Sequence, residues 1–277
     1  MLSDLKISQT KDSDFTIHAI ELEEKRLEQV TGIDNYNMIH ERHRIFPSVF
    51  ENRKHKKILD TAAGVGVVAE RINKYYDGEI ICNDISPKCL SILKKQGLKT
   101  LSFNIDSEYE PFPIKDGEYD AVISLSTIEH VYNIDHYISE IHRILKPSGY
   151  LYISAPNYNG LGYLVQLLRT GKTFHNPLNE IDKYEFYAHL RYFTYKTLLE
   201  YVSLFGFSPE AVYLGLPQGS TKFLRLKERS ILKAFIIRNI MKTLYTCFSP
   251  RWCTEPIICF KKTENNPVRL KPRKVIL

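Results

Sequence analysis

From residue 57 onward the chain alternates between short apolar runs and amphipathic segments. Short apolar runs bounded by turn residues indicate buried strands, and apolar residues that recur every three or four positions indicate helices. The predicted strands are 57–59, 79–82, 100–103, 121–125, 150–154, 211–214 and 256–260. The predicted helices between them are 67–75, 87–95, 134–145 and 195–205. Strands that alternate with helices form βαβ units, so the pattern predicts an α/β fold with a mostly parallel sheet between helical layers.

The segment before this alternation has a different pattern. Residues 1–55 are polar and of mixed charge, with apolar residues at helical spacing over 16–29 and 35–50. We therefore expect an N-terminal helical cap over residues 1–55 and one α/β domain over 56–263. An insertion rich in Tyr, Asn, Gly and His, residues 157–190, interrupts this domain. It is expected to lie over the carboxyl ends of the strands, where open α/β sheets bind ligands.

Positive charge is concentrated at the C-terminal end. The 277 residues carry 38 Lys or Arg and 32 Asp or Glu, and residues 222–277 carry 14 Lys or Arg against 3 Asp or Glu. A second insertion, 216–252, mixes basic with aliphatic residues, and residues 264–277 are expected to form a flexible basic tail. Residues 222–248 could lie in a membrane interface or form a buried cap over a substrate. Nucleic acid is a poorer partner, because the basic residues lie among aliphatic rather than stacking aromatic side chains.

The remaining composition describes an ordinary globular protein. Hydrophobic residues make up 43% of the chain, and no stretch approaches the length of a spanning helix. Five cysteines without a C-x-x-C pair argue against a disulfide framework or a zinc site. We expect a cytoplasmic protein, with or without peripheral attachment to the inner membrane face, and no metal site. The sequence does not predict the oligomeric state.

The strongest chemical signal is the turn after the first strand. This strand ends at Asp60 and passes through Thr-Ala-Ala-Gly-Val-Gly into a helix. Gly64 and Gly66 permit positive φ and leave room for a ligand against the backbone. Asp84 ends the second strand, where a carboxylate can accept hydrogen bonds from both hydroxyls of a ribose. Asp106 ends the third strand, placed to accept a bond from an adenine amino group.

The acidic residue before the loop separates two classes of nucleotide. The spacing Gly64-x-Gly66-x-x-Ala69 alone also fits a dinucleotide-binding loop. Asp60, however, would repel a pyrophosphate and suits the positive amino group of a methionine moiety. The acids therefore favour S-adenosylmethionine as the cofactor. The alternatives from other classes are an NAD-dependent oxidoreductase and a non-catalytic nucleoside-binding protein.

Further motifs follow in a fixed order along the chain. They occupy residues 83–86, 106–112, 118–123, 128–131, 145–149, 153–157 and 189–194. With these motifs, over about residues 36–215, the chain resembles the class I S-adenosylmethionine-dependent methyltransferases, in particular the type-11 branch that includes quinone and sugar O-methyltransferases. Ala62 stands where that family's loop has its first glycine. The resemblance implies a Rossmann-like three-layer sandwich with helical insertions and a seven-stranded, mostly parallel sheet whose last strand is antiparallel.

The predicted site residues follow from these motifs and positions. The predicted cofactor-binding residues are Asp60, Ala62, Gly64, Gly66, Asp84, Ile85, Asp106 and Ser124. His130 follows the fourth strand and is the candidate general base, with a packing role as the alternative. The candidate acceptor-binding residues are Tyr158, His175, His189 and Arg191, where Arg191 could instead tether the insertion through a buried ion pair.

The predicted reaction is an in-line methyl transfer. Its acceptor is expected to be an oxygen of a small molecule or of a saccharide or lipid-linked intermediate. Methylation of a quinone-type, lipid-soluble ring is the alternative within the family. The sequence does not identify the acceptor or the atom that is methylated.

Overall fold

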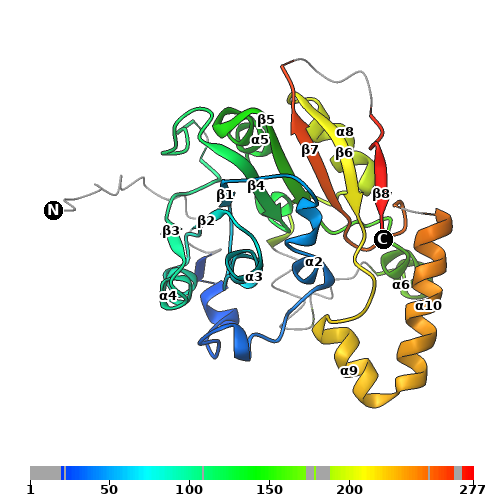
Figure 1. Cartoon of the computed structure of the whole chain (residues 1–277). Coiled ribbons are helices and arrows are strands. Elements are labelled where there is room, and N and C mark those ends of the chain that lie inside the picture. The colour runs from blue at the N-terminus through cyan, green and yellow to red at the C-terminus, as the bar shows by residue number, and fades with distance from the viewer. Residues whose placement is uncertain are drawn as a thin grey trace.

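A single eight-stranded sheet organises the part of the chain that the structure describes (Figure 1). This computed structural model describes residues 20–21, 23–107, 109–172, 178, 188–248, 250–264 and 270–277. The strands are β1 (Lys57–Asp60), β2 (Glu79–Asn83), β3 (Lys99–Leu101), β4 (Tyr119–Leu125), β5 (Leu145–Ser154), β6 (Phe207–Tyr213), β7 (Ile257–Lys262) and β8 (Lys274–Ile276). Their order across the sheet is β3-β2-β1-β4-β5-β7-β6-β8. The predicted Rossmann-like α/β class is confirmed.

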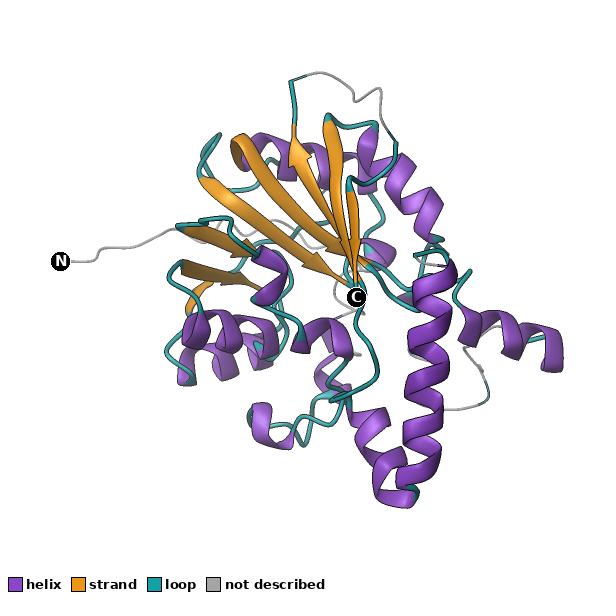
Figure 2. Ribbon diagram, turned by 45° about the vertical axis from the view of Figure 1, so that its right-hand side comes forward, coloured by secondary structure: helices purple, strands orange, loops and turns teal. Residues whose placement is uncertain are grey.

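Helices connect and cover these strands (Figure 2). They are α2 (Glu41–Arg44), α3 (Val67–Tyr75), α4 (Pro87–Lys95), α5 (Ile134–Ile144), α6 (Leu161–Thr170), α8 (Tyr195–Ser203), α9 (Thr221–Arg229) and α10 (Ile231–Phe248). Short 3-10 helices are η1 (Ile33–Asn35), η2 (Ser48–Phe50) and η3 (Ile128–His130). The helices predicted over 67–75 and 87–95 have the predicted bounds, since each has an apolar stripe on one side.

Alternate residues of the strands pack into two separate apolar clusters. Leu59 and Val122 belong to one cluster, and their neighbours Ile58 and Ile123 belong to the other. Successive strand side chains point to opposite faces, so the two clusters lie on the two sides of the sheet. Helices α5 and α8 pack on the first face, and α3 and α4 pack on the second. The sheet is thus buried on both sides, as a mostly parallel sheet requires.

The C-terminal end differs from the prediction of a flexible basic tail. β7 is antiparallel to β5 and β6, as predicted, but it is not the last strand. Residues 274–276 form β8, which pairs in parallel with β6 and raises the strand number from the predicted seven to eight. The cause is local: Val275 and Ile276 are β-branched, and Ile276 packs against the second cluster. Lys274 also pairs with Glu51 at 2.5 Å.

The N-terminal segment also differs from the prediction of a helix over 35–50. The structure divides it into an extended stretch, the four-residue α2, and η2. Pro47 has no N–H to continue α2, so the helix ends before it. Phe46 and Phe50 are instead buried against the sheet. Of the helix predicted over 16–29, residues 20–21 and 23–26 are helical, and its earlier residues lie outside the described chain.

The second insertion forms the pair α9 and α10, which extends away from the sheet (Figures 1 and 2). Its first turn is held by Glu41 of α2. The carboxylate oxygen Oε1 of Glu41 accepts hydrogen bonds from the backbone N–H groups of Gln218 (2.6 Å), Gly219 (2.9 Å) and Ser220 (2.9 Å). Thr221 adds a backbone bond to Ile39 of 2.9 Å. The insertion is therefore fixed at its root to the segment before β1.

Replacing Glu41 by Ala is expected to lower the free energy of unfolding by about 1.5–3 kcal/mol, because three backbone donors lose a charged acceptor. Burial alone would raise the pKa of Glu41, but bonds from Arg44 and the backbone lower it. The carboxylate therefore stabilises the fold above pH 4.5, and this contribution disappears as the pH falls through the lowered pKa. Urea unfolding at pH 7 and pH 3.5 measures both effects. The control is Glu200→Ala, because among the described residues the half-exposed Glu200 forms an ion pair only with Lys196 in the same helix, at 3.6 Å. Equal losses of stability in both variants would contradict the role of Glu41.

Candidate cofactor and acceptor site

The loop after β1 contains two glycines, one beside open space and one packed closely against a neighbouring side chain. Gly64 has φ of +56°, and a Cβ added there would have nothing within 4 Å. Gly66 has φ of +85°, and a Cβ added there would lie 2.7 Å from Leu93 Cδ2. Gly66 thus approaches the Leu93 side chain of α4 closely in a left-handed conformation that favours glycine, whereas Gly64 presents bare backbone to open space. Bare backbone beside open space is what a closely bound nucleoside needs.

Asp84 joins this loop to the end of β2. Its Oδ2 accepts a hydrogen bond from the N–H of Gly64 at 2.8 Å, and its Oδ1 accepts one from Ser86 at 2.9 Å. Burial raises the pKa of Asp84 to about 6, and the carboxylate of Glu23 adds to the shift. Each oxygen of a carboxylate has further acceptor capacity. Asp84 can therefore position the loop and still accept bonds from a ligand's hydroxyls.

Asp60 lies at the end of β1 and is only 5% exposed. Burial raises its pKa to about 7, the N–H of Ala62 opposes the shift, and the charge of Asp84 adds to it. No Lys or Arg within the described ranges forms an ion pair with Asp60 or Asp84. Two neighbouring carboxylates without a cation fit a ligand that brings an ammonium group and vicinal hydroxyls. S-adenosylmethionine has both, so the residues present fit this cofactor.

Two residues that the sequence analysis did not predict as site residues, Asn83 and Tyr137, support the loop after β1 through buried hydrogen bonds. The Asn83 side-chain amide donates to the carbonyls of Thr61 (2.9 Å) and Phe103 (3.1 Å). The Tyr137 hydroxyl donates to Ser124 Oγ at 2.9 Å and lies 2.7 Å from Thr61 Oγ1. The position of Asn83 directly before Asp84 could have indicated its role from the sequence. Tyr137 looks like any apolar position of α5 until its hydroxyl partners are known.

The structure places the remaining predicted cofactor residues in different settings. Ser124 is fully buried beneath the loop, so it supports Tyr137 rather than facing open space. Asp106 accepts bonds from the N–H groups of Tyr132 (2.9 Å) and Asn133 (2.8 Å), which join the loop after β3 to the start of α5. Its predicted contact with an adenine amino group stays a prediction.

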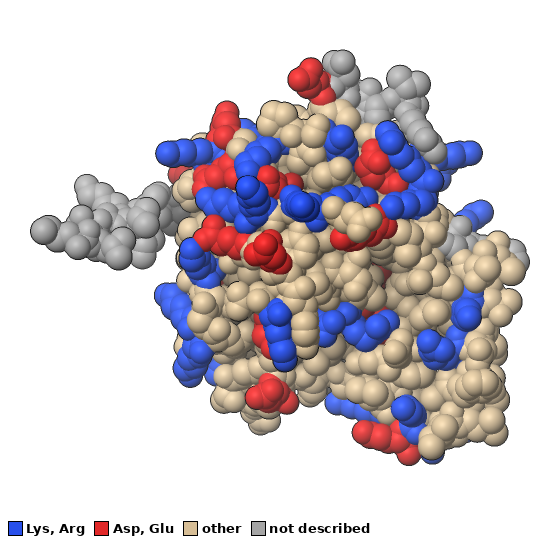
Figure 3. Space-filling model, in the orientation of Figure 1, with Lys and Arg blue, Asp and Glu red and all other residues tan. Residues whose placement is uncertain are grey.

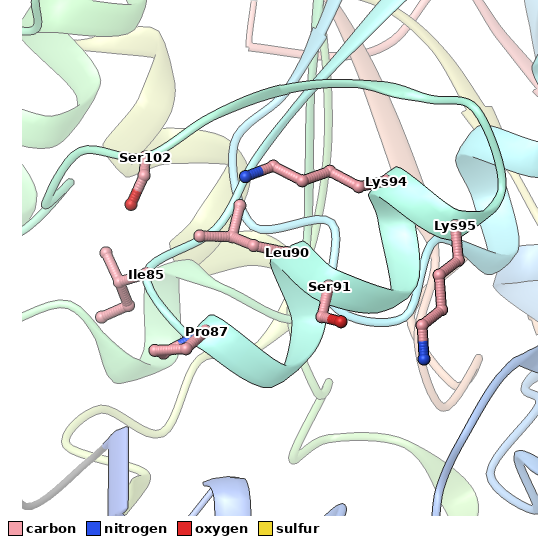
Figure 4. A pocket seen from close by; sticks show the side chains of 7 residues that line it. All are labelled: Ile85, Pro87, Leu90, Ser91, Lys94, Lys95 and Ser102. Atoms are coloured by element: carbon pink, nitrogen blue, oxygen red, sulfur yellow. The ribbon is translucent and has the colours of Figure 1, made fainter.

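Ile85, the residue after Asp84, lines a hollow of about 650 Å³ beside α4 (Figure 4). Its other lining residues are Pro87, Leu90, Ser91, Lys94, Lys95 and Ser102. Figure 4 shows Lys94 extending across the hollow toward Ser102, whereas Lys95 points away. The hollow begins where the ribose is expected to lie, so its apolar wall of Ile85 and Leu90 is available to one face of a base.

A second group of polar side chains lies after β4. Glu129 is fully buried, and burial raises its pKa to about 8. His130 Nδ1 bonds to the carbonyl of Ala188 at 2.9 Å, and its Nε2 lies 3.9 Å from Glu129 Oε1. The His189 ring is 4.7 Å from that of His130. Ligand atoms of Glu129, His130 and His189 all lie within 4.8 Å of one another, a set that could also hold a divalent cation.

Two of the four predicted acceptor residues meet at this group. Tyr158 and His189 are joined by a 2.9 Å bond between the hydroxyl and Nδ1. Among the described residues no carboxylate forms an ion pair with Arg191, so the ion pair considered as its alternative role is not seen there. Its guanidinium donates to the carbonyls of Val131 and Tyr132, which ties the insertion to the loop after β4. His175 lies outside the described residues.

A further polar cluster at this edge was not visible in the sequence. Glu255, just before β7, accepts bonds from Ser126, from Ser154 at 3.0 Å, and from Arg42 of α2. The Arg42 and Glu255 side chains are 12% and 15% exposed. The ends of β4 and β5 are thus tied to the N-terminal segment. These residues are far apart in sequence and form no motif, so only the fold brings them together.

Comparison with known proteins identifies the domain. Residues 59–153 match the family described as "Methyltransferase domain". This span contains Asp60, Asp84 and the loop of His130, in the order that the motifs predict. Residues 59–153 are thus similar to a methyltransferase domain. S-adenosylmethionine, the cofactor that the sequence motifs predict, also fits the two buried acidic residues described above.

Individual relatives share part of the chain. The uncharacterised protein MJ0638 of Methanocaldococcus jannaschii is 34% identical over 149 residues, which cover 52% of this chain and 62% of that protein. A demethylmenaquinone methyltransferase of Chlorobaculum parvum is 30% identical over 125 residues, covering 45% of this chain and 51% of the relative. The chain thus spans only about half to three fifths of the length of these relatives.

Solved structures agree with the fold. The methyltransferase of Thermotoga maritima described as a possible histamine N-methyltransferase superposes with a TM-score of 0.56. The superposition covers 89% of this chain and 99% of that one, at 16% identity. At this identity the likeness establishes the arrangement of sheet and helices and leaves the acceptor open.

Asp60 should make binding of S-adenosylmethionine pH-dependent. Because the pKa of Asp60 is about 7, its carboxyl is mostly protonated below pH 7 and must lose this proton before it can pair with a cationic amino group. The affinity for S-adenosylmethionine is therefore expected to rise between about pH 6 and pH 8. Calorimetry at pH 6 in two buffers of different ionisation enthalpy measures the released proton. The control ligand is an adenosine thioether without the amino-acid part, which can contact Asp84 but has no amino group for Asp60. S-adenosylmethionine should release more protons on binding than this control ligand, and Asp60→Asn should abolish that difference. Equal proton release by the two ligands in the wild-type protein would contradict the pairing of Asp60 with the amino group.

Proposed function

We propose that this chain is an S-adenosylmethionine-dependent methyltransferase that methylates a hydroxyl oxygen. The acceptor is a small molecule or a saccharide or lipid-linked intermediate. The observation that carries the proposal is the position of His130, a histidine with an oriented ring beside the edge where the acidic cofactor residues end their strands. When bound, the cofactor supplies a methyl group on a positively charged sulfur, which is a good leaving group.

The acidic residues are assigned to holding and orienting the cofactor. Asp84 accepts bonds from the ribose hydroxyls, and Asp60 pairs with the amino group. Asp106 is assigned to the adenine. The support for these roles is that Asp60 and Asp84 are buried, close together and without a cationic partner among the described residues. Rigid orientation matters here because in-line displacement depends mainly on alignment.

His130 is assigned to removing the acceptor proton. The carbonyl of Ala188 can only accept, so Nδ1 of His130 donates the proton in their 2.9 Å bond. In the neutral ring Nε2 is then the nitrogen that accepts a proton. Glu129 Oε1 lies 3.9 Å from Nε2. Because burial raises the pKa of Glu129 to about 8, its carboxyl stabilises the resulting imidazolium as a charge partner only once it has lost its own proton. A base of this kind is needed for a hydroxyl acceptor, since an alcohol is a weak nucleophile.

Tyr158 and His189 are assigned to positioning the acceptor. Their 2.9 Å bond places a hydroxyl and an imidazole next to His130. The ring of Tyr158 also packs against Tyr163 and Tyr192, with ring centroids 4.8 Å and 4.6 Å apart. Such packing fixes the hydroxyl while presenting apolar surface, a combination that suits an amphipathic acceptor.

A quinone-type, lipid-soluble ring is the second candidate acceptor. Its support is the partial match to a protein named as a demethylmenaquinone methyltransferase, together with the aromatic surface around Tyr158. An NAD-dependent oxidoreductase is disfavoured, because the buried Asp60 would lie against the pyrophosphate.

Substituting His130 tests the assigned base. His130→Asn keeps a side-chain N–H that can bond to the Ala188 carbonyl but cannot accept a proton at neutral pH. We expect kcat to fall by about 10²–10⁴ while affinity for S-adenosylmethionine changes less than about twofold. S-adenosylhomocysteine formation with a panel of hydroxylated acceptors gives kcat. Wild-type turnover in the Asn variant would show that His130 is a structural residue.

A further inference from the structure

Helix α10 exposes an unusual amount of apolar surface. Leu232 is 67% exposed and Phe235 is 65% exposed, and both lie in the first turns of this 18-residue helix. The other exposed apolar residues of α10 are Ile231, Ile236, Ile237 and Ile240. Ala234 and Tyr245 are buried and mark the opposite, inward side. The helix thus packs through one side, and its outward side is apolar, which contradicts the alternative of a buried cap helix.

Basic residues lie among these exposed apolar residues and on the neighbouring helix α9. Helices α9 and α10 together contain seven Lys or Arg and one Glu. Lys233 and Lys242 are exposed on α10, and Arg225, Lys227 and Arg229 are exposed on α9. Figure 3 shows mostly uncharged surface over α10, with scattered Lys and Arg side chains. An exposed apolar surface with basic residues interspersed indicates a binding face rather than an ordinary solvent-facing helix.

We infer that the outward side of α9 and α10 docks on a membrane surface that contains anionic lipids. α10 would lie in the plane of the interface, with Leu232, Phe235 and Ile236 among the acyl chains. Its lysines reach the headgroup phosphates. α10 has 18 residues and is about 27 Å long. Within the described chain, no helix is long and apolar enough to cross a bilayer.

The charge pattern favours a lipid surface over the other occupants. A second copy of this chain in a two-fold dimer would bring basic residues against basic residues. Nucleic acid would need stacking aromatic side chains, and Phe235 is the aromatic residue on the exposed side in this part of the structure. Anionic headgroups provide negative charge and apolar chains at once, and each basic residue near them contributes about 1 kcal/mol.

Docking would also orient the methyltransferase site, a consequence that rests on the proposed function. The root of α9 is bonded to Glu41 and Ile39, and the neighbouring Arg42 reaches Glu255 beside the ends of β4 and β5. The membrane-facing helices are thus fixed to the same edge of the sheet that carries the candidate site. A lipid-linked acceptor could pass from the membrane to this edge without leaving the interface.

Flotation with lipid vesicles tests the docking surface on the full chain. Vesicles of phosphatidylcholine mixed with phosphatidylglycerol should bind at least about tenfold more protein than phosphatidylcholine alone, and high salt should reduce this binding. The double variant Leu232→Ser/Phe235→Ser should lose at least about tenfold in binding. Leu204→Ser is the matched control, because Leu204 is also 66% exposed but follows α8.

The outcomes separate the inference from the proposed function. Urea unfolding and S-adenosylmethionine binding check that the double variant is folded, and methyl transfer is assayed without vesicles. Equal binding to both kinds of vesicle, or equal losses in the double variant and in Leu204→Ser, would overturn the docking surface. Self-association by sedimentation without vesicle binding would also overturn it, since the face would then join two copies. The proposed methyltransferase activity is tested separately, by methyl transfer without vesicles, whichever result the vesicle experiment gives.

Discussion

The hydrogen bond from the Gly64 N–H to the Asp84 carboxylate is the contact on which the cofactor site depends. It joins the loop after β1 to the end of β2 at 2.8 Å, and it does so with a buried acid. The charge of Asp84 adds to the cost of ionising the buried Asp60. The fold thus places two buried carboxyl groups, without a described cationic partner, where β1 and β2 end. A cationic nucleoside is the ligand that relieves this cost.

The parts of the fold that the sequence predicted are those with local causes. Strands β1 and β4 and helices α3 and α4 follow from apolar spacing within a few residues. The acidic strand ends follow from short motifs. The contacts of Glu255 with Arg42, and of Tyr137 with the cofactor loop, could not be predicted, since they join positions far apart in sequence. β8 was not predicted because the basic composition of residues 264–277 indicated a flexible tail, although residues 274–276 pair with β6.

The segment around Glu41 connects the candidate site to the proposed docking surface. This segment is tied to the ends of β4 and β5 through Arg42 and Glu255, and it also anchors α9 and α10. The buried acids Asp60 and Asp84 lie at the ends of β1 and β2, whereas exposed basic and apolar side chains lie on α9 and α10. The proposed function and the proposed docking surface together require this arrangement, with a cofactor from water and an acceptor from an interface.

The central claim is that the acidic strand ends select a cationic sulfur nucleoside over a dinucleotide. Calorimetric titration of the purified protein with S-adenosylmethionine, S-adenosylhomocysteine and NAD measures this choice directly. The two sulfur nucleosides should bind with micromolar dissociation constants and NAD should not bind, because Asp60 repels a pyrophosphate. Binding of NAD without binding of either sulfur nucleoside would contradict the account.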